Sequence, residues 1–157
     1  MGNEFNANDI FEIAVKIEKN GALFYRDAAN RVEGEIYKNF LFDLAQMEDE
    51  HEAVFADMQK ELKDGETFPA TFDPNDENAL YLKALADTRV FFKKEQPGNK
   101  IKDILTSALQ AEKDSIAFYL GMKELIPAKL GKSKIDTIIK EEMSHIRLLA
   151  GKLTEYH

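Results

Sequence analysis

The chain has 157 residues, of which 44% are hydrophobic and 32% charged, and its formal net charge at pH 7 is -8. This length and composition suit one globular domain, predicted here to span residues 1–157, and the acidity argues against nucleic acid or an anionic membrane surface as the main partner. The chain has no cysteine, which excludes disulfides, iron–sulfur clusters and thiolate zinc sites. It shows neither a signal-peptide pattern nor a long apolar run, so we expect a cytoplasmic protein.

Two long helices are predicted in the first half of the chain, over residues 9–33 and 35–64. Both segments carry apolar residues at the three- and four-residue spacing of a buried helix face. Asp9 is the expected N-cap of the first helix, with Glu12 as its capping-box partner. The second helix is expected to end at Gly65, because glycine commonly follows the last turn of a helix.

A shorter helix and a second long pair are predicted in the rest of the chain, over residues 78–93, 100–126 and 133–156. Asn99 is the expected cap of the first long helix of this pair, and Ser133 opens the second. The connection between the two long hairpins spans roughly 35 residues, which suits a four-helix bundle with one long crossover. The sequence therefore predicts an all-α fold.

Glutamates, histidines and Phe-Tyr pairs recur in the two halves of the chain at one fixed offset of 94 residues. Each half contains a lone glutamate and, 30 residues later, a Glu-x-x-His unit. The matched residues are Glu18 and Glu112, Phe24 and Phe118, Tyr25 and Tyr119, Glu48 and Glu142, and His51 and His145. One Glu-x-x-His unit on a helix is weak evidence, but solvated helix faces do not explain a repeated array that interrupts apolar stripes.

The repeated glutamates and histidines match the ligand set of a two-metal site inside a helical bundle. Residues three apart lie on the same side of a helix, so each Glu-x-x-His unit can offer an oxygen and a nitrogen to one point. Four carboxylates balance two divalent cations, and these ligands suit iron or manganese, with zinc also able to bind. The predicted metal ligands, which are also the predicted catalytic residues, are Glu18, Glu48, His51, Glu112, Glu142 and His145.

Tyr25 and Tyr119 lie seven residues after the lone glutamates, two helical turns along the same stripe. A phenol at that place could donate a hydrogen bond to a ligand carboxylate. Buried tyrosines are also common in the cores of bundles. The two tyrosines therefore have either a supporting role beside the metals or a packing role.

On these motifs the chain resembles the ferritin-like superfamily, and within it the rubrerythrin-related branch. The segments that carry the resemblance are IEKNGALFYRDAA around Glu18, MEDEH ending at His51, AEKDSIAFY around Glu112 and EEMSH ending at His145. The resemblance implies a ferritin-like four-helix bundle whose long crossover contains an extra short helix. It also implies two irons bridged by Glu48 and Glu142, with Glu18 and Glu112 as terminal ligands and one histidine on each iron.

The chain departs from the patterns of related families at three places. Rubrerythrins carry a rubredoxin module with iron-binding cysteines, which this chain lacks, so the resemblance implies a separate electron-donor protein. They also have a glutamate three residues after the ligand that corresponds to Glu112, and this chain has Ser115 there. Haem is not expected, because Asp49 stands where bacterioferritins have their haem-binding methionine. A homodimer is the oligomeric state that the resemblance implies.

Three functions are compatible with the sequence. The favoured one is a non-haem di-iron oxidoreductase that reacts with hydrogen peroxide or oxygen, by peroxidase or ferroxidase chemistry of the rubrerythrin kind. The second is a non-catalytic protein that sequesters or delivers iron. The third is a di-manganese protein that disproportionates peroxide and needs no outside electrons.

Overall fold

The computed structural model describes residues 6–65, 76–88, 98–126 and 128–155. Within these ranges the chain forms five α-helices and one 3-10 turn, so the predicted all-α architecture is confirmed. None of the helices in the described ranges is both long enough and apolar enough to cross a membrane.

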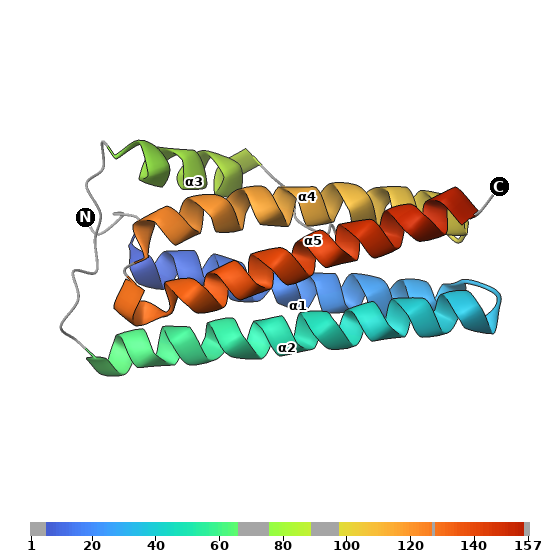
Figure 1. Cartoon of the computed structure of the whole chain (residues 1–157), viewed down its shortest axis with the longest axis horizontal. Helices are drawn as coiled ribbons and strands as arrows, with labels where there is room; N and C mark the ends of the chain where they lie inside the picture. The colour runs from blue at the N-terminus through green and yellow to red at the C-terminus, as the bar shows by residue number, and fades with distance from the viewer. Residues whose placement is uncertain (1–5, 66–75, 89–97, 127, 156–157) are drawn as a thin grey trace.

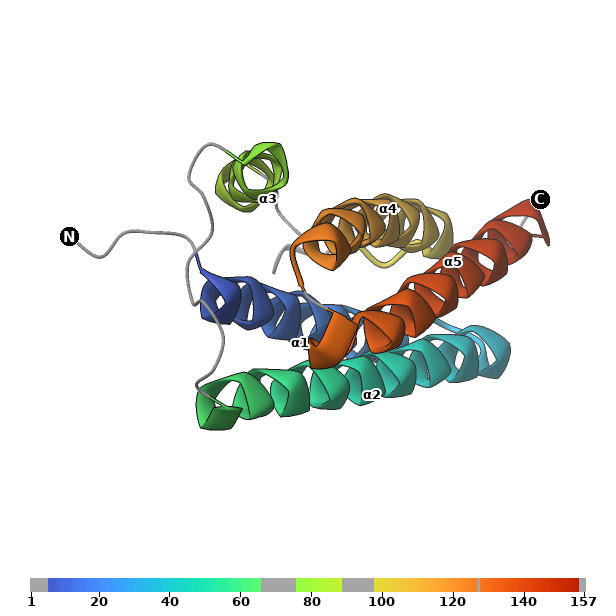
Figure 2. The ribbon, with the colours of Figure 1, turned by 60° about the vertical axis from the view of Figure 1, so that its left-hand side comes forward.

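The long helices form two antiparallel hairpins that lie side by side as a four-helix bundle (Figure 1). The first hairpin consists of α1 (Ala7–Arg31) and α2 (Glu35–Gly65), and the second of α4 (Ile101–Leu125) and α5 (Lys132–Glu155). Helix α3 (Glu77–Thr88) lies outside the bundle and packs on α4 (Figure 2). Helix α2 ends at the left of Figure 1 and α4 begins at the right, so the long crossover joins opposite ends of the bundle.

The first helix begins earlier than predicted, because its cap is Asn6 rather than Asp9. The Asp9 backbone N–H donates to Asn6 Oδ1 at 2.9 Å, and the Asn6 backbone N–H donates to Asp9 Oδ2 at 3.1 Å. Asp9 is therefore the third-residue partner of the capping box, and the prediction that it caps the helix with Glu12 was wrong.

The two helices of the second hairpin also begin differently from the prediction. Lys100 precedes α4 and makes no side-chain cap, whereas Asn99 Oδ1 accepts a hydrogen bond from Arg31 Nη1 at 2.7 Å. Helix α5 follows Gly131, whose φ of +105° lies in the left-handed region, so Ser133 is inside the helix. The predicted helical residues 89–93 lie outside the described residues.

Helix α3 approaches the bundle at a glycine of α4. A Cβ atom added to Gly121 would lie 2.8 Å from the Leu82 side chain and 2.9 Å from the Tyr81 ring. The Tyr81 hydroxyl donates to the Ala117 carbonyl oxygen at 3.1 Å. The missing side chain at Gly121 thus leaves the space that α3 occupies.

Two hydrophobic clusters fill the bundle, one toward each end. One cluster includes Phe11, Phe55 and Phe118, and the other includes Leu41 and Leu105. On each of the four long helices, the predicted metal ligands come between the residues of the two clusters in sequence. The packing therefore holds a polar layer in the middle of the bundle, with apolar residues on both sides.

Candidate metal centre

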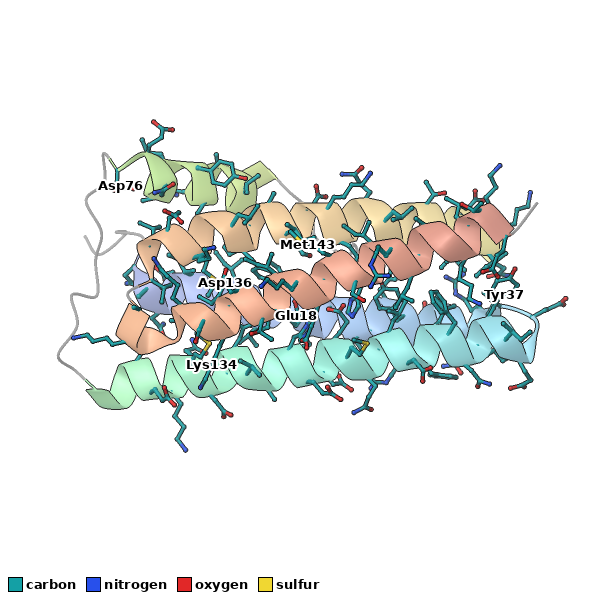
Figure 3. All side chains as sticks on the ribbon, in the orientation of Figure 1. Glu18, Tyr37, Asp76, Lys134, Asp136 and Met143 are labelled. Carbon is teal, nitrogen blue, oxygen red and sulfur yellow. The ribbon has the colours of Figure 1, made fainter. Side chains whose placement is uncertain are left out.

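The structure brings all six predicted ligands together in that polar layer, and none is more than 3% exposed. Helices α1 and α4 each contribute one of them, and α2 and α5 each contribute a Glu-x-x-His unit. Figure 3 labels Glu18, which lies near the middle of the bundle. Each lone glutamate and each Glu-x-x-His unit faces inward because it continues the apolar stripe of its own helix.

The six residues form two overlapping groups of four. Within each group, one ligand atom per residue can be chosen so that all four atoms lie within 4.8 Å of one another. The first group is Glu18, Glu48, His51 and Glu142, and the second is Glu48, Glu112, Glu142 and His145. Glu48 and Glu142 belong to both groups, as expected of carboxylates that bridge two metal ions.

Both histidines direct Nδ1 toward the carboxylates. His51 Nδ1 lies 3.2 Å from Glu18 Oε1 and 2.9 Å from Glu142 Oε1. His145 Nδ1 lies 3.0 Å from Glu112 Oε2 and 3.2 Å from Glu48 Oε1. Each imidazole therefore faces one carboxylate of its own hairpin and one of the other hairpin.

The chemistry of the donor set fits a pair of divalent cations. Both carboxyl oxygens of Glu48 and of Glu142 are buried, and among the described residues none has a hydrogen-bond partner. Buried carboxylates without partners are costly unless a cation or a proton neutralises them. The four glutamates and two Nδ1 atoms would satisfy two ions that prefer mixed oxygen and nitrogen ligands.

Both tyrosines of the internal repeat donate hydrogen bonds to predicted ligand carboxylates, and these hydrogen bonds cross between the hairpins. The Tyr25 hydroxyl donates to Glu112 Oε2 at 2.9 Å, and the Tyr119 hydroxyl donates to Glu18 Oε2. Each tyrosine is fully buried, and burial together with the neighbouring carboxylates raises its pKa well above the usual value. Both phenols therefore remain protonated donors, each fixing the glutamate that belongs to the opposite hairpin.

Burial and mutual repulsion control the protonation of the carboxyls in the absence of metal. Burial, followed by the charges of the nearby glutamates, raises the pKa of Glu48 and of Glu142 well above the usual value. Burial also favours neutral Glu112, but its close contacts with Glu142, His145 and Tyr25 outweigh burial and lower the pKa of Glu112. In the metal-free cluster, protonation is therefore favoured most at the two shared glutamates.

One residue of the site was missed by the sequence analysis. Glu141 Oε1 accepts a hydrogen bond from His51 Nε2 at 2.7 Å. The internal repeat concealed this residue, because the position 94 residues earlier is Met47, which has no carboxylate. Its position directly before a ligand glutamate and four residues before His145 was the available indication.

Two residues that the sequence analysis compared with related families have other partners in the structure. Asp49 forms an ion pair with Arg26 on the first hairpin. The buried Ser115 hydroxyl donates to the Ala111 carbonyl oxygen at 2.9 Å, within its own helix.

A pocket of about 400 Å³ lies between α2 and α5, beside one residue of the candidate centre. His51 and Glu141 line it together with Val54 and Ile138, and its polar wall includes Lys134. Because His51 is also in the first ligand group, this pocket lies next to one side of the candidate centre.

The fold and the buried ligand cluster define a ferritin-like four-helix bundle with a candidate two-metal centre. The structure is similar to a crystal structure of a Thermotoga maritima protein provisionally described as a ferritin-like diiron-carboxylate protein. The match covers 100% of both chains with a TM-score of 0.69 and 23% sequence identity, so the likeness concerns the fold. No protein-family model and no curated protein matches the chain.

Proposed function

We propose that this protein binds two metal ions, in the first place iron, and acts as a non-haem oxidoreductase on hydrogen peroxide or oxygen. The observation that carries the proposal is the pair of buried four-residue groups that share Glu48 and Glu142. Their unpartnered oxygens support bridging roles for these two residues. Glu18 with His51, and Glu112 with His145, would complete the two positions as terminal ligands.

A bound iron pair would supply two electrons, one from each metal, to a small oxidant. The chain's own contribution is to hold the ligand side chains in place and to exclude bulk water from them. Tyr25 and Tyr119 each hold one terminal carboxylate by a hydrogen bond, leaving its other oxygen for a metal. The hydrophobic clusters on both sides exclude bulk water, which strengthens charge interactions within the layer.

The pocket beside His51 supports the choice of a small oxidant. Peroxide or oxygen could approach through it without opening the bundle, because the pocket lies against one ligand of the centre. A large organic substrate would need to pass the packed residues around that ligand. The buried position of the cluster therefore favours small-molecule redox chemistry.

We further propose that reducing electrons come from a separate donor protein, since this chain has no cysteine to hold an iron–sulfur relay. A cytoplasmic homodimer is the form in which we expect the protein to work. Analytical ultracentrifugation would measure the oligomeric state directly.

The test begins with metal analysis and an optical spectrum of protein purified from iron-supplemented cells. The reduced protein is then mixed anaerobically with peroxide, and separately with oxygen, in a stopped-flow instrument. We expect about two irons per chain and oxidation much faster than that of free iron(II), repeatable after each addition of reductant.

The other outcomes distinguish the remaining functions. Iron that is taken up and never cycles would identify a carrier or sequestering protein. Two manganese ions with peroxide disproportionation in the absence of reductant would identify the manganese chemistry. Failure to bind any metal stoichiometrically would overturn the proposed function altogether.

A further inference from the structure

The two histidines occupy equivalent positions in the internal repeat, but they differ at the nitrogen that faces away from the cluster. His51 Nε2 donates to Glu141 Oε1 at 2.7 Å. His145 Nε2 is buried, and no group in the described part of the chain pairs with it. Within the described residues, the outward nitrogen of His51 therefore has a carboxylate acceptor, and that of His145 has none.

The two halves of the repeat differ at the position of Glu141. Glu141 directly precedes Glu142 on α5, and the residue in the same place before Glu48 on α2 is Met47. A thioether sulfur is at most a weak acceptor, so Met47 cannot replace the carboxylate. The repeat preserves the six predicted ligands, but only the second half has a carboxylate at the position of Glu141.

This acceptor matters because an imidazole binds a metal through one nitrogen while the other carries the proton. The hydrogen bond to Glu141 keeps the proton on His51 Nε2, which leaves the Nδ1 lone pair directed at Glu18 and Glu142. A carboxylate in this position also makes the imidazole a stronger ligand. His145 must adopt the same tautomer without this support.

We propose that Glu141 is a positioning residue that makes the two metal positions unequal, so that the position formed by Glu18, Glu48, His51 and Glu142 binds metal more tightly. This inference rests on the proposed two-metal function. Loss of such a supporting partner typically weakens metal binding about 10- to 100-fold. The Glu141 side chain is 47% exposed, and solvent screening therefore places the expected effect near the lower end, about tenfold.

The test is an anaerobic titration with cobalt(II), whose visible absorption reports ligation at each step. Wild-type protein should bind two ions in two resolved steps. Glu141→Met puts at position 141 the residue found at the equivalent position 47 and removes the acceptor from His51, so it should weaken the tighter step about tenfold while leaving the weaker step unchanged. Glu141→Gln retains an acceptor oxygen and should preserve most of the difference between the steps.

Two further variants assign the steps to positions. Glu18→Ala removes a ligand found only in the first group, so it should mainly weaken the tighter step and leave the other step nearly unchanged. Met47→Glu offers His145 the missing acceptor and should strengthen the weaker step. Because Glu141 is half exposed, the Glu141 variants should fold even if a charge at position 47 does not.

The inference is overturned if wild-type protein binds two ions with equal affinity, or if Glu141→Met weakens both steps equally or neither. Either of these results would leave the two-metal function standing. Wild-type protein that binds fewer than two ions would instead defeat the proposed function, and the inference with it.

Discussion

At the scale of single residues, the crossed tyrosine hydrogen bonds determine how the terminal glutamates are held. Tyr25 and Tyr119 are buried donors to charged acceptors, a kind of hydrogen bond that contributes about 1.5–3 kcal/mol. Tyr25→Phe and Tyr119→Phe should each lower the free energy of unfolding of the metal-loaded protein by about that amount. Denaturant unfolding monitored by circular dichroism would measure it.

Tyr81→Phe is the matched control for this prediction, because the Tyr81 hydroxyl bonds a neutral carbonyl at an exposed site. Its cost should be about 1 kcal/mol or less. Equal losses in all three variants would show that the buried phenols have no special role beside the ligand carboxylates.

The shared glutamates should differ from the terminal ones in how many metals depend on them. Glu48→Ala or Glu142→Ala removes a member of both ligand groups, so each variant should lose both metals. Glu18→Ala or Glu112→Ala removes a member of one group and should mainly weaken one metal. Metal content per chain after desalting measures the difference, and equal retention in all four variants would contradict the bridging assignment.

The sequence identified the six clustered residues but not every partner around them. Spacing along one helix shows which side chains share a face, so it placed Tyr25 on the stripe of Glu18. It does not show which residue of another helix lies opposite, and Tyr25 in fact bonds Glu112. Glu141 was missed for two reasons: it is not part of the internal repeat, and its partner His51 lies on a different helix.

At the scale of helices, α3 depends on the absence of a side chain at Gly121. In a helix interior, Gly→Ala normally stabilises by about 0.5–1 kcal/mol. At Gly121 the added methyl group would meet Leu82 and Tyr81, and overpacking of this kind costs about 1–3 kcal/mol. We therefore expect Gly121→Ala to be less stable than Gly151→Ala by roughly 1–3 kcal/mol.

Gly151 is the control because it is also helical and a Cβ there would meet nothing within 4 Å. Thermal unfolding compares the two variants, and hydrogen exchange over residues 77–88 tests whether α3 in particular has loosened. Equal gains in stability at both glycines would mean that α3 is not held at Gly121.

The helices themselves were predictable, whereas their first residues were less so. Long apolar stripes are strong indications of helices, and all four long helices lie close to the predicted ranges. The helix starts depend on local competition between caps that spacing alone does not decide. Asn6 and Asp9 are both good capping residues, and the structure uses the first as the cap and the second as its partner.

At the scale of the whole molecule, the buried polar layer makes the stability of the metal-free protein depend on pH. The pKa values of Glu48 and Glu142 are raised, so the folded chain holds protons that the unfolded chain releases. The resulting stability is complete below the ordinary carboxyl pKa and is lost as pH rises through the raised values. For His51, burial opposes protonation, but the carboxylates of Glu18 and Glu141 outweigh burial and raise its pKa. The raised pKa of His51 therefore also makes the folded protein less stable as pH rises.

We therefore expect the metal-free protein to become less stable as pH rises through the interval above the ordinary carboxyl pKa, since the lowered pKa of Glu112 acts in the opposite direction only at lower pH. Metal binding displaces these protons, so stabilisation by metal should grow over the same interval. Urea unfolding at several pH values, with a chelator and then with metal, measures both trends. A metal-free protein that gains stability as pH rises would contradict the assigned protonation.

Each ligand group takes three residues from one hairpin and one from the other. A bound ion would therefore cross-link two segments that are far apart in the chain, and separating the hairpins would require breaking bonds to both ions. In a chain without cysteine, the metal pair would take the place of a disulfide as a clamp across the fold. Removing the ions with a chelator would then open a reversible cross-link, as reduction opens a disulfide.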